Sequence, residues 1–466
     1  MSQDSSKKHS GSPTAVRWIV LGIVAFASAS AYLTRYCISA ANTTIQQDLG
    51  FDDAQMGQLM SAFALGYLLC QIPGGWLGTR FGTRIAFAFL SILWSLCNFG
   101  SAIAIGFKVM CASRFSLGVF QAGLAPVSAR ILKDWIPIRW RGVSSAYIAA
   151  SMSVGGAFTL WVTGWLLAHD YGWRGIFAAY SLVGIVWAIG FYWYFRTFPN
   201  DHSAVNQAEL NLIVDAGESN RNGNKSREIV PDATEVEDGQ VKHPHTDDPY
   251  RVSVAAIDRD SGTLVVNMLQ SVAMWGLCIQ SFFRAAGYVF FATWFFAFLE
   301  YVYGITRAEA GLLSSLPLMA VVVGSLLGGV IVDWLLRASG SKWISRSGTA
   351  IVALTVCGIL TMASAWTSSA TELATVIALG AVFAGIGSPA AWAATIDIGG
   401  RNTAIVMGVM NMAGCLAAVI LPTLLGSWFQ DIRETDGDWD LVIHLHAAFY
   451  FFGALSWLMV NPDREV

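Results

Sequence analysis

The sequence has few charges, because Asp, Glu, Lys and Arg make up only 13% of its 466 residues, whereas about 25% is usual in a soluble domain. Its seven cysteines include no CxxC pair, so the sequence indicates neither a disulfide framework nor a metal site. The HExxH, GxxxxGK(S/T) and GxSxG motifs are absent, and we therefore expect no enzymatic activity, no cofactor and no use of ATP. The net charge of −3 gives no indication of a nucleic-acid partner.

Apolar residues dominate the chain, with a hydrophobic content of 55% and a mean hydropathy of +0.53. A membrane-spanning helix needs about 20 mainly apolar residues, and the first such run, after Arg17, is too long for the core of a typical signal peptide. The sequence therefore predicts an all-α polytopic membrane protein with twelve transmembrane helices. The predicted spans are Trp18–Ala40, Met56–Leu77, Ile85–Ile105, Val109–Leu132, Val143–Leu167, Gly175–Phe195, Leu269–Phe298, Ala310–Leu335, Gly348–Ala365, Leu373–Ile396, Ile405–Phe429 and Val442–Val460.

A polar stretch at 197–262 contains no span and is rich in Asp, Glu, Asn, Lys and Arg, a composition typical of a flexible linker. It separates a tail (1–16) and a first six-helix bundle (17–196) from a second six-helix bundle (263–466). Outside this linker, the Lys and Arg residues of the tails and short loops lie mostly on the side of the termini. The positive-inside rule therefore predicts that both termini and the linker are cytoplasmic, in a multi-pass protein of the inner or plasma membrane.

Three arginines, Arg35, Arg114 and Arg284, lie within predicted spans, and no carboxylate lies comparably deep in any of them. A cation at the centre of a bilayer costs roughly 2.5–3.5 kcal/mol on the lowest scale, so such residues usually have a function. The guanidinium group is always charged and presents a fork of donors that matches a carboxylate or a phosphate. The three arginines therefore indicate an anionic substrate. Arg35 and Arg114 lie towards span ends, where snorkelling of the side chain to the interface is the alternative.

Several motifs along the chain occur together in one known family. They are Gly75–Arg84 with a weaker second-half copy at Gly329–Arg337, Tyr32-Leu-Thr-Arg35, Ser61–Tyr67 with Gln71–Trp76, Arg114-Phe-x-x-Gly118 with Pro126 and Trp135–Arg139, Pro199–Glu209, Ala310–Pro317, and Gly408–Asn411 with Pro422. Together they resemble the major facilitator superfamily and, within it, the anion:cation symporters, which include sugar-acid transporters. This resemblance implies two six-helix bundles in the major facilitator fold.

The resemblance also implies a substrate site between the two bundles. Arg35 and Arg284, one from each half, are predicted to bind the carboxylate of the substrate. Tyr32 and Tyr67 match family positions that face the substrate, although most tyrosines in membrane helices are structural or interfacial.

Two further residues are predicted to contact polar groups of the substrate. Trp392 follows Ser388-Pro389, a predicted kink that exposes carbonyl groups to a cavity. Asn411 is an amide within the eleventh span; its alternative role is an interhelical hydrogen bond that contributes about 0.6 kcal/mol.

The chain departs from the family at two positions. The acids implicated in proton coupling are replaced by Thr34 in the first span and by Gln121 in the fourth. We predict that Thr34, Gln121 and Arg114 form a gating or coupling site, but proton coupling through it is in question. The neutral Gln121 and the Tyr-Leu-x-Arg string are also similar to the organophosphate:phosphate antiporters.

The sequence thus predicts a secondary active transporter that moves a small organic anion, such as a carboxylate of the hexuronate or aldonate type, across the bilayer by alternating access. Coupling to H⁺ or Na⁺ is ranked narrowly first on family grounds, and a monomer is expected. Two alternatives stay open, namely an organophosphate:phosphate antiporter and a nutrient receptor of the same fold that binds its ligand without transporting it.

Overall fold

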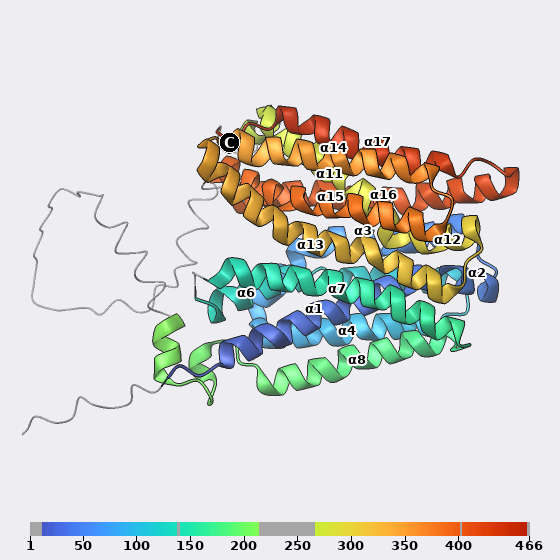
Figure 1. Ribbon diagram of the computed structural model, residues 1–466. Helices are drawn as coiled ribbons and strands as arrows, with labels where there is room; N and C mark the ends of the chain where they lie inside the picture. Colours follow the sequence, from blue (N-terminus) through green and yellow to red (C-terminus); the bar gives the residue numbers. More distant parts are fainter. Residues whose placement is uncertain (1–11, 138–139, 214–265, 401–402, 464–466) are drawn as a thin grey trace, which may run out of the picture.

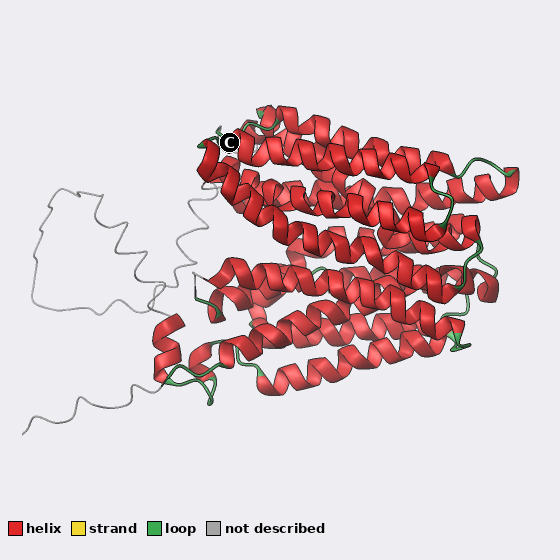
Figure 2. Cartoon of the chain, viewed as in Figure 1, coloured by secondary structure: helices red, strands yellow, loops and turns green. Residues whose placement is uncertain are grey.

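The computed structural model describes residues 12–137, 140–213, 266–400 and 403–463. These residues form helices joined by short loops, with no strand among them (Figures 1 and 2). The helices from α1 to α8 form one bundle and those from α11 to α17 form a second bundle beside it (Figure 1). The predicted all-α class with two helical bundles is therefore confirmed.

The helices of the first bundle are α1 (Val16–Ala40), α2 (Asn42–Leu49), α3 (Asp53–Phe81), α4 (Thr83–Ala102), α5 (Phe107–Gln121), α6 (Leu124–Trp135), α7 (Arg141–Ala168) and α8 (Trp173–Tyr194). Those of the second bundle are α11 (Val272–Thr293), α12 (Phe295–Tyr303), α13 (Arg307–Ser339), α14 (Thr349–Ala363), α15 (Ala370–Gly399), α16 (Thr403–Thr435) and α17 (Asp440–Ser456). A π-helical turn (Ile344–Gly348) leads into α14.

Twelve membrane crossings account for these helices. Ten helical stretches in the described part of the chain are long and apolar enough to cross a bilayer, and α11 with α12 forms a further span that is bent by 59°. The twelfth is α3, which has 29 residues. It meets α16 of the second bundle partly through polar groups, as where the Thr423 hydroxyl donates to the Ser61 hydroxyl at 2.8 Å.

The seventh span differs from its prediction. The sequence predicts one continuous helix over Leu269–Phe298, whereas α11 ends at Thr293 and α12 begins at Phe295. Between them lies Trp294, which is fully buried and donates from its indole nitrogen to the Pro422 carbonyl at 3.1 Å. The bend therefore follows from packing against α16 rather than from a local helix breaker.

Small residues let the helices of the second bundle approach closely. A Cβ atom added to Gly324 of α13 would lie 1.9 Å from the carbonyl oxygen of Val382 on α15, and one added to Gly385 would lie 2.5 Å from that of Val321. Only glycine permits such backbone contacts. These small-residue strings therefore serve helix packing.

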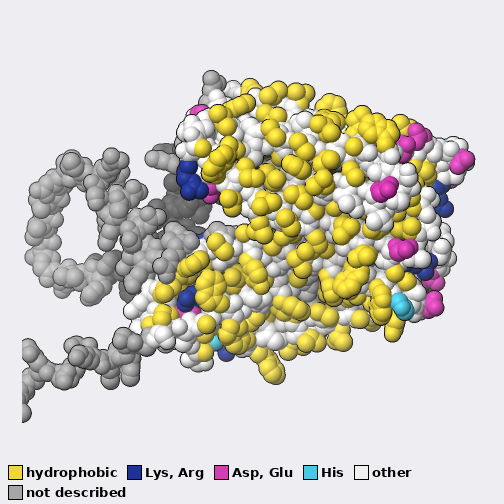
Figure 3. Space-filling view, in the orientation of Figure 1, with side chains coloured by type: hydrophobic (Ala, Val, Ile, Leu, Met, Phe, Trp, Pro, Cys, Tyr) yellow, Lys and Arg dark blue, Asp and Glu magenta, His cyan; other side chains and the backbone are white. Residues whose placement is uncertain are grey.

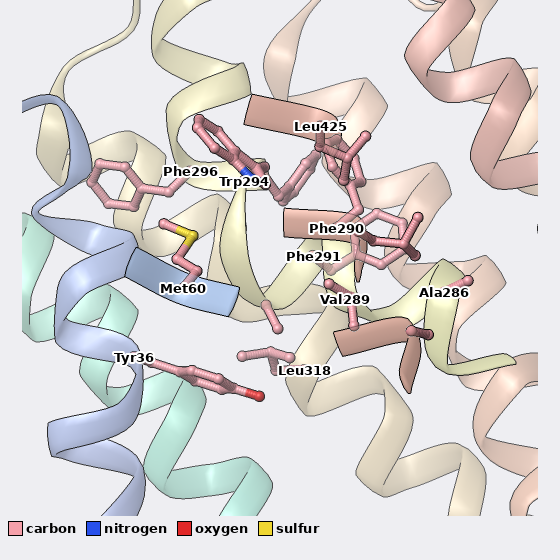
Figure 4. Packing of buried hydrophobic residues seen from close by; sticks show 14 of the residues in the cluster. Tyr36, Met60, Ala286, Val289, Phe290, Phe291, Trp294, Phe296, Leu318 and Leu425 are labelled. Carbon is pink, nitrogen blue, oxygen red and sulfur yellow. The ribbon is translucent and has the colours of Figure 1, made fainter. Parts of the chain in front are cut away.

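The two ends of the bundle interface differ. At the end away from the termini, α3 meets α16 and α7 meets α13 through glycines: a Cβ atom on Gly57 would lie 2.3 Å from the Pro422 carbonyl oxygen, and one on Gly164 would lie 2.5 Å from that of Arg307. Buried apolar side chains from both bundles fill the space nearby (Figure 4). At the end that carries the termini, Figure 3 shows a notch between the bundles. We call these the closed end and the open end.

The beginning of the predicted linker packs on the open end of the first bundle. Glu209 is fully buried and accepts from the Arg17 guanidinium at 3.0 Å. His202 is buried between Trp135 and Tyr194. The structure thus places 197–213 with the first bundle, while 214–262 lies outside the described residues.

Candidate functional site

A cavity of about 220 Å³ lies between the bundles. No Asp or Glu occurs among the described residues that line it. Its lining includes Arg35 and Tyr36 from α1, Met60 and Phe63 from α3, Arg114 from α5, Arg284 and Tyr288 from α11, and Asn411, Cys415 and Pro422 from α16. The structure therefore brings the three predicted membrane arginines to one cavity without a resident carboxylate.

Arg35 is held by aromatic rings. Its guanidinium carbon lies 4.8 Å from the ring centroid of Phe63 and 5.2 Å from those of Tyr32 and Tyr67. Such cation–π contacts stabilise a charge without using its N–H donors. The guanidinium has no hydrogen bond or ion pair with another described residue, so its donors are free for a ligand in the cavity. Tyr32 and Tyr67 lie against Arg35 rather than among the cavity-lining residues, and their predicted contact with substrate stays a prediction.

Arg284 faces the cavity from the second bundle. Its side chain is half-buried, and its Nε atom is buried without a hydrogen-bond partner. It also lines a smaller cavity of about 50 Å³ within the second bundle, together with Ser388 and Tyr450. No described carboxylate pairs with it. A buried donor without a partner requires an explanation, and an anionic ligand in either cavity provides one.

Arg114, Gln121 and Thr34 form one buried network where α5 meets α1. Arg114 donates to the carbonyl oxygens of Thr34 at 3.0 Å and Arg35 at 3.1 Å. Gln121 donates to the Thr34 hydroxyl at 2.8 Å and to the Ala31 carbonyl at 3.0 Å. The two neutral residues that replace the family acids therefore contact each other directly. The network fixes the backbone that carries Arg35, and its gating or coupling role stays a prediction.

Asn411 lines the cavity and reaches across the interface. Its amide donates to Gln71 of α3 at 3.0 Å, and Gln71 in turn donates to the Cys415 sulfur at 3.2 Å. Trp392 is 56% exposed and lines neither cavity. It lies four residues after Ser388, one helical turn closer to the open end. The structure thus brings Asn411, but not Trp392, to the cavity with the arginines.

Sequence reasoning missed a pair of tyrosines that lines the cavity and a glutamine that contacts the lining residues Asn411 and Cys415. The hydroxyls of Tyr36 and Tyr288 lie 3.2 Å apart across the bundle interface, on the closed-end side of Arg35 and Arg284. Both tyrosines line the cavity. Nothing in the sequence around either tyrosine indicates that the two would meet. Gln71 was also missed, although an amide within an apolar stretch is a detectable signal.

Beyond the tyrosine pair, a carboxylate joins the bundles at the closed end. Asp53 of α3 is 2% exposed. It accepts hydrogen bonds from Gln46 at 2.6 Å, from the Tyr301 hydroxyl at 2.8 Å and from Arg433 at 2.8 Å. Since Tyr301 and Arg433 belong to the second bundle, we call Asp53, Tyr301 and Arg433 the closed-end latch. Other hydrogen bonds also cross at this end, from Thr43 to Glu300 (2.7 Å), from Tyr301 to Gln46 (3.2 Å) and from Arg307 to Gln47 (3.2 Å).

Comparison with known proteins identifies the family. The model of the Major Facilitator Superfamily matches residues 24–422 and 277–466. The chain belongs to the Major Facilitator Superfamily. The fold agrees, since a superfamily structure, the crystal structure of a bacterial homologue of the human lysosomal transporter Spinster, superposes with a TM-score of 0.67 at 17% identity and covers 97% of this chain and 95% of that one.

Curated relatives in the superfamily are named as transporters of organic acids. The chain is 26% identical to the probable sulfoacetate transporter SauU of Cupriavidus necator, over 96% of this chain and 94% of that protein. It is 27% identical to the probable galactarate/D-glucarate transporter GudP of Bacillus subtilis (98% and 94% covered) and 25% identical to the D-galactonate transporter of Escherichia coli (96% and 96%). The predicted resemblance is therefore confirmed, and the chain is a transporter-type membrane protein rather than an enzyme.

In this superfamily member, the cavity has the chemistry of an anion site. Guanidinium groups from opposite bundles supply charge and forked donors, the Tyr36–Tyr288 hydroxyls and the Asn411 amide supply neutral hydrogen-bonding groups, and the remaining lining is largely apolar. This matches the usual form of a small-molecule site, with a few polar groups in an apolar cleft.

Proposed function

We propose that this protein transports a small organic anion bearing a carboxylate by alternating access, with Arg35 and Arg284 binding the anion between the two bundles. The observation that carries the proposal is the presence of two arginines from opposite bundles in one cavity, neither of them paired with a described carboxylate. A membrane cavity with this charge is expensive to maintain unless a ligand uses it.

The charges also suggest how binding drives closure. A buried charge without a partner costs several kcal/mol, so the empty cavity resists the exclusion of water. An anion that neutralises the arginines removes this cost, and the bundles then close around it. Because one arginine belongs to each bundle, the bound anion also joins the two moving parts.

We propose that the protein lies in the inner or plasma membrane with its open end facing the cytoplasm. In support, Lys and Arg residues of the described loops and helix ends are more numerous at the end of the termini than at the opposite end, as the positive-inside rule expects of a cytoplasmic side. Those at the end of the termini are Arg17, Arg80, Arg84, Arg130, Lys133, Arg141, Arg196, Arg337, Lys342 and Arg346, and those at the opposite end are Lys108, Arg174, Arg307 and Arg433. Figure 3 shows Lys and Arg at both ends and a gathering of acidic side chains at the end opposite the termini. In this orientation the structure corresponds to a transporter open to the inside. Coupling to H⁺ or Na⁺ is part of the proposal, but the neutral Thr34–Gln121 pair offers no acid to carry a proton, so a coupling ion would bind elsewhere.

The test is counterflow in liposomes loaded with individual carboxylates or sugar phosphates. We expect carboxylates to drive exchange in the parent protein. Arg284→Ala should abolish it, while Arg337→Ala, at the surface of α13 near the open end, should not. Exchange with sugar phosphates alone would instead indicate an organophosphate:phosphate antiporter. Ligand binding without any counterflow would indicate a receptor, and undiminished binding by Arg284→Ala would show that the assigned site is wrong.

A further inference from the structure

We infer that the substrate is a dianion with an acidic group at each end, one bound by Arg35 and the other by Arg284. This inference rests on the proposed function and narrows its substrate class. It also departs from the hexuronate or aldonate type predicted from the sequence, since those compounds carry a single acid. The relatives named above do not decide the matter, because sulfoacetate, galactarate and glucarate have two acidic groups whereas galactonate has one.

The hydrogen-bonding capacity of the two arginines exceeds what one carboxylate uses through paired hydrogen bonds. A guanidinium offers five N–H donors, and a carboxylate pairs with one such fork through two parallel hydrogen bonds. Among the described residues, no protein acceptor takes a hydrogen bond from the guanidinium of Arg35 or Arg284. Two unused forks thus face the cavity, and a carboxylate that pairs with one fork through two parallel hydrogen bonds leaves the other fork without such a partner.

The two arginines occupy different surroundings. Arg35 is held among the rings of Tyr32, Phe63 and Tyr67 in the first bundle. Arg284 also lines the smaller cavity of about 50 Å³ within the second bundle, which Arg35 does not reach. The two guanidinium groups are therefore suited to bind the two ends of one ligand.

The charge of the occupied cavity also favours a dianion. Arg35, Arg114 and Arg284 line it, and no Asp or Glu is among its described lining residues. A monoanion therefore leaves two positive charges without an ionic partner, whereas a dianion leaves one. That one is assigned to Arg114, which already donates to two helix carbonyls. Because charge imbalance is most costly when water is excluded, the dianion favours closure more strongly.

A matched pair of ligands tests the inference, because galactarate and galactonate share a six-carbon chain and differ in having two acids or one. Binding of each to the purified protein is measured by titration calorimetry at neutral pH, where all the carboxylates are ionised. We expect the parent protein to bind galactarate at least about tenfold more tightly, or about 1.4 kcal/mol. In Arg284→Gln, binding of galactarate should fall at least about tenfold more than binding of galactonate. Arg337→Gln should leave both affinities unchanged.

The outcomes separate this inference from the proposed function. Equal affinity of the parent for the two ligands, or tighter binding of galactonate, would overturn the dianion inference and leave organic-anion transport intact. An equal loss of both ligands in Arg284→Gln would overturn the assignment of the second acid to Arg284. Since the parent measurement needs no variant, the inference is testable even if Arg284→Gln does not fold. Failure of every carboxylate in both calorimetry and counterflow would overturn the proposed function itself.

Discussion

Replacing Asp53 by asparagine should open the closed end of the transporter. Asp53 belongs to the first bundle and is 2% exposed, and two of its three hydrogen-bond donors, Tyr301 and Arg433, come from the second bundle. Hydrogen bonds to a charged group contribute about 1.5–3 kcal/mol each. Because the Arg433 side chain is 47% exposed, its share is reduced to at most about 1 kcal/mol. Asparagine keeps the size of the side chain but removes its charge, so we expect the closed end to lose about 2 kcal/mol in Asp53→Asn.

A loss of about 2 kcal/mol shifts the conformational equilibrium about 30-fold towards the state open at the opposite side. Cys415 reports this shift because its free thiol lines the central cavity. In a variant that retains only this cysteine, a membrane-impermeant thiol reagent added on the closed-end side should label Asp53→Asn much faster than the parent. The labelling rate from the open-end side should fall.

The matched control is Asp431→Asn, which removes an exposed carboxylate at the same end whose side chain has no hydrogen-bond or ion-pair partner among the described residues. It should label at the parental rate. If Asp53→Asn and Asp431→Asn label at equal rates from the closed-end side, the latch does not hold that end shut, and the mechanical role assigned to Asp53 is refuted.

Three other predictions follow from the packing and the polar networks. Gly324→Ala should lower the free energy of unfolding by about 1–3 kcal/mol, whereas Gly329→Ala, which has no atom within 4 Å of the added Cβ, should not; equal melting temperatures would contradict the packing argument. Gln121→Glu introduces an acid into the buried network, so counterflow should depend on pH more steeply than in the parent, and identical pH profiles would show that this position does not influence coupling. Burial lowers the pKa of His202, so its packing stabilises the neutral ring above its unfolded pKa of about 6.5, and this stability is lost as pH falls through the lower folded pKa. Amide protection factors in 197–213, which correct exchange rates for their intrinsic pH dependence, should therefore fall on acidification more in the parent than in His202→Phe.

The sequence predicts the helical fold well because membrane spans are encoded locally. Each span must be about 20 residues of mainly apolar sequence, and this signal does not depend on the neighbouring helices. The bend at Trp294 is different. No proline or glycine marks it, and the helix breaks where the indole meets the Pro422 carbonyl on another helix. Such a break depends on tertiary contacts that the local pattern does not contain.

The same distinction applies to the candidate site. Arginines in apolar spans are conspicuous, because a charge there is costly. The Tyr36–Tyr288 pair is inconspicuous in the sequence, because each tyrosine alone resembles any other tyrosine in a membrane helix. The partner of each hydroxyl lies in the other bundle and is found only from the structure. Gln71 likewise joins the site only through its hydrogen bond with Asn411, which lies 340 positions later in the chain. Sequence reasoning therefore finds the charges of the site more readily than the neutral groups around them.

The described lining of the cavity contains no acid that could neutralise its arginines, and this absence bears on the mechanism. A resident carboxylate beside Arg35 or Arg284 would neutralise the site without substrate and would let the empty bundles close. Because the described lining contains no Asp or Glu, neutralisation depends on the ligand. The carboxylate that joins the bundles, Asp53, instead lies at the closed end, beyond the Tyr36–Tyr288 pair. The acid therefore stabilises the closed end and does not neutralise the arginines of the cavity. Closure around the site then depends on the bound anion, so the cavity closes with substrate inside.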